Sequence, residues 1–159
     1  MPTSSGYQTA FVSSIPRYEG PVKTLVVLCS QHNIQEQCDD LLRNHLKKDS
    51  YYVIAVPGGP QFFSERSLLL PKYRWAGTKW ASFLVTHVHL EEVILIAHEE
   101  CAWYRDLYGR TGDLADLVIS DLKKIAPIAG WRTGNDSINV QLYYARANQK
   151  NLLEFLKID

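Results

Sequence analysis

Hydrophobic residues in this chain fall into short unbroken runs separated by longer amphipathic stretches. The run at 24–28 contains only β-branched and aliphatic residues, which is typical of a strand buried on both faces of a parallel sheet. Between such runs, apolar residues recur at steps of three and four, the period of a helix with one buried face. The pattern predicts buried strands at 24–28, 51–56, 93–97 and 138–144, and helices at 34–47, 73–89, 113–125 and 149–157.

The order of these elements predicts the fold class. Strands alternate with helices, as in the βαβ units that build a parallel sheet with helices packed against it. The breaking residues agree with the boundaries: the run at 57–60 reads Pro-Gly-Gly-Pro, Asp113 is suited to cap a helix, and Pro127 follows the expected helix end near Ile125. We therefore expect an α/β fold, with a mostly parallel β-sheet flanked by helices.

The first residues do not share this pattern. Residues 1–21 carry Ser, Pro, Gly and Gln without a sustained period, which is typical of an irregular arm. We predict an N-terminal arm at 1–21 and a single α/β domain at 22–159, which is long enough to bury a core without disulfide bonds.

Charge and composition exclude several classes of partner. Lys plus Arg equals Asp plus Glu at 17 each, so no net field attracts nucleic acid or anionic lipid. The sequence has neither an apolar run of the ~20 residues that span a bilayer nor a signal peptide at its start. Three cysteines, an odd number, fit a reducing compartment. We expect a cytoplasmic protein that binds neither nucleic acid nor membrane.

Candidate metal ligands stand where two of the predicted strands end. In an open parallel sheet, binding sites gather at the carboxyl ends of the strands. Cys29 follows the first strand, and His98 and Cys101 follow the third, so the three side chains meet if these strands are neighbours. Two thiolates and an imidazole suit zinc, and three protein ligands leave a fourth position for water or substrate. The sequence therefore predicts a zinc site of the catalytic type.

These motifs resemble those of the β-class carbonic anhydrase family. The family places Cys-x-Asp-x-Arg after the first strand, an Arg-Asn-Ala-Gly-Gly-like loop after the second and Gly-His-x-x-Cys-Gly after the third. The stretches 25–33, 53–59 and 94–101 take these places in the same order, within a resemblance that spans 22–159. It implies a β-carbonic-anhydrase-like fold, Zn²⁺ on the three ligands, a homodimer or higher homo-oligomer, and hydration of CO2 to bicarbonate by zinc-bound hydroxide.

The chain departs from the family at the Asp and Arg of the first motif. Those positions hold Gln31 and Asn33, and a neutral amide can neither take up a proton nor form a bidentate ion pair. Three residues are candidates to replace the pair. His32 belongs to a residue type that titrates near pH 6.5 and shuttles protons, Gln31 can hydrogen-bond a zinc-bound anion, and Glu100, or its neighbour Glu99, can supply a carboxylate. A solvent-facing histidine and a solvated acidic turn are the structural alternatives.

Three functions remain open from the sequence. The first is a zinc lyase of the carbonic anhydrase type that acts on CO2 or a similar small electrophile, with catalytic roles for His32, Gln31 and Glu100. The second is a non-catalytic zinc- or anion-binding protein. The third is a metal-free enzyme that uses Cys29 or Cys101 as a nucleophile beside His98.

Aromatic residues follow the Gly-Gly loop. They are candidates to line a pocket or a subunit interface, with simple packing as the alternative. The set is Phe62, Phe63, Tyr73, Trp75 and Trp80.

Overall fold

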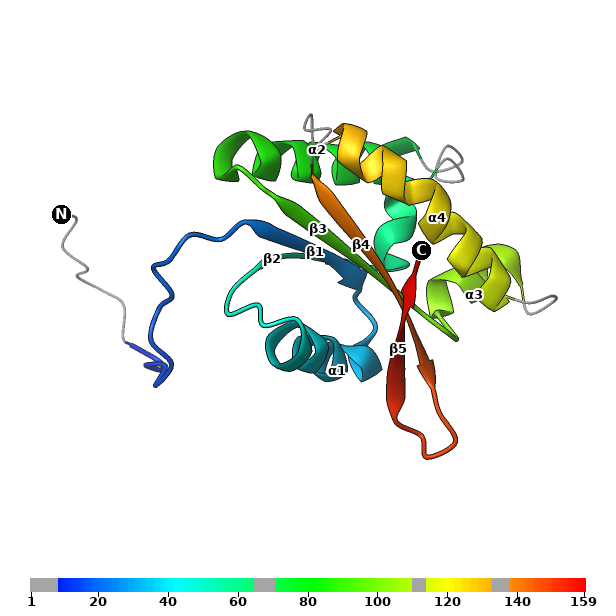
Figure 1. Ribbon diagram of the computed structural model, residues 1–159, viewed down its shortest axis with the longest axis horizontal. Coiled ribbons are helices and arrows are strands. Elements are labelled where there is room, and N and C mark those ends of the chain that lie inside the picture. The colour runs from blue at the N-terminus through cyan, green and yellow to red at the C-terminus, as the bar shows by residue number, and fades with distance from the viewer. Residues whose placement is uncertain (1–8, 65–70, 110–113, 133–137) are drawn as a thin grey trace.

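A five-stranded sheet forms the centre of the computed structural model, which describes residues 9–64, 71–109, 114–132 and 138–159 (Figure 1). The strands lie in the order β2-β1-β3-β4-β5; β1 to β4 are parallel and β5 is antiparallel to β4. This arrangement confirms the predicted α/β fold with a mostly parallel sheet. The strands are β1 (Thr24–Cys29), β2 (Tyr52–Val56), β3 (Glu92–His98), β4 (Asn139–Ala147) and β5 (Leu153–Ile158).

Helices cover both faces of the sheet. The long helices α2 and α4 lie on one face with α3 near the end of α4, and α1 lies on the other face (Figure 1). Because β1 and β3 are central, every residue in both strands is buried, as expected for a continuous apolar run. The helical segments are η1 (His32–Ile34), α1 (Gln35–Asp40), η2 (Leu41–His45), η3 (Gly59–Phe63), α2 (Pro71–Val88), α3 (Ala102–Tyr108) and α4 (Leu114–Arg132).

Two expectations about the predicted strands and helices are corrected by their place in the fold. The strand predicted at 51–56 was expected to be buried, yet β2 forms the edge of the sheet and Val53 is exposed. The helix expected to end near Ile125 continues through Pro127 to Arg132. Val118, Leu122 and Ile125 anchor this helix in the core, while the ring of Pro127 is exposed. Asp113, its predicted cap, lies outside the described residues.

The predicted C-terminal helix at 149–157 is wrong, because this segment forms β5. The turn between β4 and β5 explains the error. The Asn148 side chain accepts hydrogen bonds from the backbone N–H groups of Lys150 and Leu152, and Asn151 takes a left-handed conformation with φ 58°. Asparagine favours both features of a turn, and the turn brings the last apolar residues back against β4. The apolar residues of β5 therefore pack as a strand despite helical spacing.

The segment before β1 has no regular secondary structure. Residues 9–21 are exposed, including Phe11, Val12 and Ile15, and the segment runs away from the sheet (Figure 1). Among the described residues, no helix combines the length and the apolar character that crossing a membrane requires.

Candidate metal centre

Cys29 is the last residue of β1, and its backbone lies next to the loop that follows β2. The backbone of Ser30 donates a hydrogen bond to the carbonyl of Val56, 3.1 Å away, which ties the two strand ends together. Gly59 has φ 51°, and a Cβ at this position would lie 2.7 Å from the backbone nitrogen of Cys29. The loop can approach the cysteine this closely only because residue 59 is glycine.

The other two candidate ligands lie at the end of the neighbouring strand. His98 closes β3, and the chain turns at Glu100, which has φ 54°, so that Cys101 lies directly before α3. Nδ1 of His98 lies 2.7 Å from the carbonyl oxygen of Glu99. If Nδ1 carries the proton, it donates a hydrogen bond to this carbonyl. Nε2 is then the ring nitrogen whose lone pair is free to bind a metal. Nε2 is buried and has no hydrogen-bond partner among the described residues.

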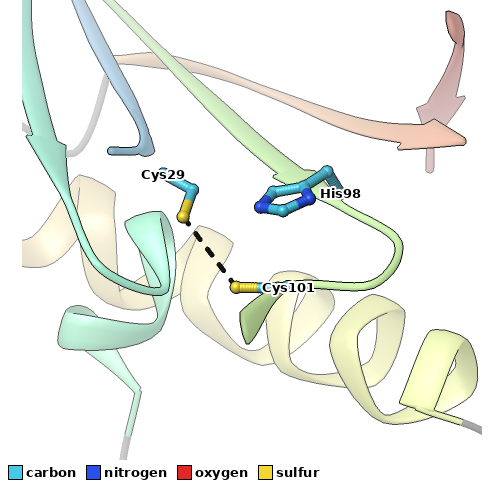
Figure 2. A group of neighbouring side chains, drawn as sticks. All are labelled: Cys29, His98 and Cys101. Atoms are coloured by element: carbon cyan, nitrogen blue, oxygen red, sulfur yellow. Dashed lines mark hydrogen bonds between the residues drawn. The ribbon is translucent and has the colours of Figure 1, made fainter. Parts of the chain in front are cut away.

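The three side chains converge as the sequence predicted. One ligand atom from each of Cys29, His98 and Cys101 lies within 4.8 Å of the other two, and all three residues are buried. The two Sγ atoms are 3.9 Å apart, with the imidazole beside them (Figure 2). Soft sulfur donors and a buried imidazole nitrogen fit a zinc ion. The residues present therefore match the metal that the motifs implied.

The two thiols are coupled through a hydrogen bond in which either sulfur can be the donor. The hydrogen bond with Cys29 lowers the pKa of Cys101; His98 lowers it further, and burial acts in the opposite direction. The same hydrogen bond, together with burial, raises the pKa of Cys29. Because zinc binds thiolates, a metal ion at this position has to displace the protons that remain on the two sulfurs.

Aromatic and amide side chains build a wall beside Cys29. Tyr73 donates a hydrogen bond to the carbonyl of Pro57, and its ring centroid lies 5.4 Å from that of Trp103. Trp103 Nε1 in turn donates to Gln61 Oε1 at 2.7 Å. A Cβ on Gly58 would lie 2.3 Å from Trp103, so the glycine admits the indole. Tyr73 is among the aromatic residues predicted from the sequence, whereas Gln61 and Trp103 are not; the position of a tryptophan two residues after Cys101 was the available signal.

The structure places the three candidate catalytic residues differently. Gln31 lies between the ligand loops: its Oε1 accepts a hydrogen bond from the backbone N–H of Ala102 at 3.1 Å, and its Nε2 donates to Asn33 at 3.0 Å. His32 is exposed at the start of η1. Glu100 is exposed in the turn before Cys101. Within the described residues, the group of side chains that could hold a metal ion contains only Cys29, His98 and Cys101; we call it the candidate metal-binding group, and none of the three candidate catalytic residues joins it.

A cavity of about 340 Å³ opens beside the candidate metal-binding group. Its wall includes His98, Cys101, Glu100, Arg105 and the apolar side chain of Val118. Glu99 also lines it, and its carboxylate accepts a hydrogen bond from the backbone of Ala147. Glu99 is therefore held by the end of β4, whereas Glu100 reaches both the cavity and solvent.

The fold is that of the β-carbonic anhydrases. Isoform I of the β-carbonic anhydrase of Trichomonas vaginalis superposes with a TM-score of 0.54 and 11% identity over 92% of this chain and 88% of that one. A carbonic anhydrase of Glaciozyma antarctica gives 0.54 and 15% over 92% and 86%, and one of Streptococcus mutans gives 0.55 and 9% over 91% and 88%.

The likeness predicted from the motifs is thus confirmed for the fold, at identities between 9% and 15%. Comparison of the sequence with protein-family models and with curated proteins finds no match.

Proposed function

We propose that this protein binds one zinc ion through Cys29, His98 and Cys101 and hydrates CO2 to bicarbonate. The convergence of the three ligand atoms within 4.8 Å carries the proposal. The likeness in fold to proteins named carbonic anhydrases supports the reaction. When bound by three protein ligands, zinc lowers the pKa of a water in its open position to about 7 and so provides a nucleophile at neutral pH.

The chain's own residues have distinct parts in this proposal. The carbonyl of Glu99 holds the imidazole of His98 so that Nε2 points to the metal position. The rings of Tyr73 and Trp103 pack against each other and present an apolar surface that suits a small apolar substrate. His32, exposed beside the first ligand loop, would pass protons to solvent, and Glu100 would do so at the cavity.

One observation favours a second function, zinc or anion binding without turnover. The family's Asp and Arg are replaced here by Gln31 and Asn33; Gln31 donates a hydrogen bond to Asn33 and accepts one from the backbone N–H of Ala102. Both polar atoms of Gln31 are therefore engaged by the protein. An amide in this state neither takes up a proton nor offers a carboxylate.

Stopped-flow CO2 hydration distinguishes the two functions. The protein is assayed with one equivalent of zinc, after chelation, and as the Cys101→Ser variant, with Cys38→Ala as a matched cysteine control. Hydration that is lost on chelation and in Cys101→Ser, and retained in Cys38→Ala, supports the lyase. No hydration by zinc-loaded protein supports the binding function. Turnover of any substrate that survives complete removal of metal would support a cysteine nucleophile.

The assembly and location belong to the same proposal. Helix α2 exposes Trp75, Trp80 and Phe83, and large exposed aromatic side chains are enriched where proteins associate. This surface supports a homodimer or higher homo-oligomer of the 22–159 domain, with 1–21 as its arm. The three cysteines, all present as free thiols, support a cytoplasmic location. Sedimentation of the purified protein tests the oligomer.

A further inference from the structure

The two cysteines of the candidate metal-binding group face each other across the ends of adjacent strands. Their Sγ atoms lie 3.9 Å apart although the residues are 72 positions apart in the sequence. We propose that Cys29 and Cys101 are also a reversible oxidation site, at which a peroxide closes a disulfide bond and so removes two of the three zinc ligands. The effect on zinc rests on the proposed function; formation of the disulfide does not.

The geometry brings the sulfurs near to bonding distance. A disulfide bond is about 2.05 Å long, so the Sγ atoms have to approach by about 1.9 Å. Cys101 lies between the turn at Glu100 and the first residue of α3, outside any helix or strand. Its side chain can therefore rotate toward Cys29 without breaking the hydrogen bonds of β1 or β3.

The oxidant has a route to one of the two sulfurs. Cys101 lines the cavity of about 340 Å³, which is far larger than a peroxide, since a water molecule takes about 30 Å³ in the liquid. Cys29 is not among the residues that line this cavity. Cys101 is therefore the expected site of attack and Cys29 the resolving thiol. Cys38, on α1, is 1% exposed and provides a natural comparison.

The reaction balances with hydrogen peroxide as the oxidant. The sulfur of Cys101 attacks one peroxide oxygen, the O–O bond breaks, and the products are a sulfenic acid and one water. The sulfur of Cys29 then attacks the sulfenic sulfur, an S–S bond forms, and a second water leaves with the thiol proton. Two thiols are oxidised and one peroxide is reduced. A bound zinc ion keeps its charge and is released, because disulfide sulfurs are not thiolate ligands.

Intact-mass spectrometry of metal-free protein treated with one equivalent of hydrogen peroxide tests the proposal. We expect a product lighter by two hydrogen atoms, a peptide map that links Cys29 to Cys101, and full reversal by a dithiol reductant. Zinc-loaded protein should release its zinc to a chromophoric chelator as the same product forms. Cys38→Ala should behave as wild type, and Cys29→Ala should instead gain one oxygen atom at Cys101.

Other results would overturn the proposal. A disulfide that includes Cys38, or the same gain of oxygen by wild type as by Cys29→Ala, would show that the 3.9 Å pair does not close. The absence of any mass change, under conditions in which the urea-unfolded chain is oxidised, would show the same. The reduced protein's zinc affinity is measured separately: if it binds no zinc while the disulfide forms, the proposed function fails and the oxidation site stands.

Discussion

The side chain of Gln31 connects the two loops that supply the sulfur ligands. Gln31 lies two residues after Cys29, and its Oε1 accepts a hydrogen bond from the backbone N–H of Ala102, the residue directly after Cys101, at 3.1 Å. This bond satisfies one of the free N–H groups at the start of α3. It also fixes the end of β1 relative to Cys101. The amide of Gln31 thus joins two parts of the chain that lie far apart in the sequence.

Loss of this link should weaken zinc binding. We expect Gln31→Ala to lower zinc affinity by about tenfold, the scale of effect for residues that hold metal ligands in place. Gln31→Glu should bind zinc more tightly than Gln31→Ala because its carboxylate still accepts the Ala102 N–H. Competition with a chromophoric chelator measures both. Gln37→Ala, at an exposed position of α1, is the control, and equal affinities for Gln31→Ala and wild type would contradict the link.

Gly59 should not tolerate a side chain. A Cβ there would lie 2.7 Å from the nitrogen of Cys29 and 2.8 Å from the carbonyl carbon of Leu28, and φ is 51°. We expect Gly59→Ala to lower the free energy of unfolding by about 1–3 kcal/mol and to weaken zinc binding, since the strain falls on a ligand.

Urea unfolding and chelator competition measure the two effects. Gly20→Ala is the matched control, because the atoms nearest to its Cβ would belong to the exposed side chain of Tyr18 in the arm. A Gly59→Ala protein with unchanged stability would show that the loop is free to move away from Cys29.

The sequence predicted the convergence of Cys29, His98 and Cys101 because its signals are local. Each ligand ends or closely follows an apolar run, and the parallel pairing of β1 with β3 brings Cys29 near His98 and Cys101. The role of Gln31 could not be predicted in this way. Its partner, the N–H of Ala102, is a backbone group 71 residues away, and backbone groups carry no sequence signal.

The errors in the fold have a similar cause. Leu152, Leu153 and Leu156 have the spacing of a helix, yet the segment pairs with β4 because the Asn148 turn and the apolar edge of the sheet decide its conformation. Pro127 predicted a helix end, but tertiary packing of the residues before it sustains α4. Where tertiary contacts compete with local preference, the sequence pattern alone gives the wrong element.

Glu92 should be important for stability because its carboxylate is buried among three partners. Oε2 lies 2.6 Å from Lys48 Nζ and accepts a hydrogen bond from Thr24 at 2.9 Å, and Oε1 accepts one from Gln141 at 2.6 Å. Glu92→Gln leaves the shape intact but turns one acceptor into a donor and leaves Lys48 without its counter-charge. We expect a loss of about 1–3 kcal/mol in the free energy of unfolding.

Glu91→Gln is the matched control for Glu92→Gln. Glu91 pairs with Lys23, and the side chains of that pair are 64% and 53% exposed. An exposed pair contributes less than about 1 kcal/mol. Equal losses in urea unfolding for the two variants would contradict the role assigned to the buried network.

Cys38 should make the protein less stable at alkaline pH. Burial raises the pKa of its thiol to about 12, whereas an unfolded cysteine titrates near pH 8.5. Above that pH the unfolded chain loses a proton that the folded chain keeps, so the stabilising contribution is complete below about pH 8.5 and falls as pH rises toward 12. The loss approaches about 1.4 kcal/mol per pH unit.

The variant Cys38→Ala tests this pH dependence because it has no thiol at this position. Its free energy of unfolding, measured in urea from pH 8 to 10 on metal-free protein, should fall less steeply than that of wild type. Parallel curves for the two proteins would show that Cys38 ionises as readily in the folded chain as in the unfolded one.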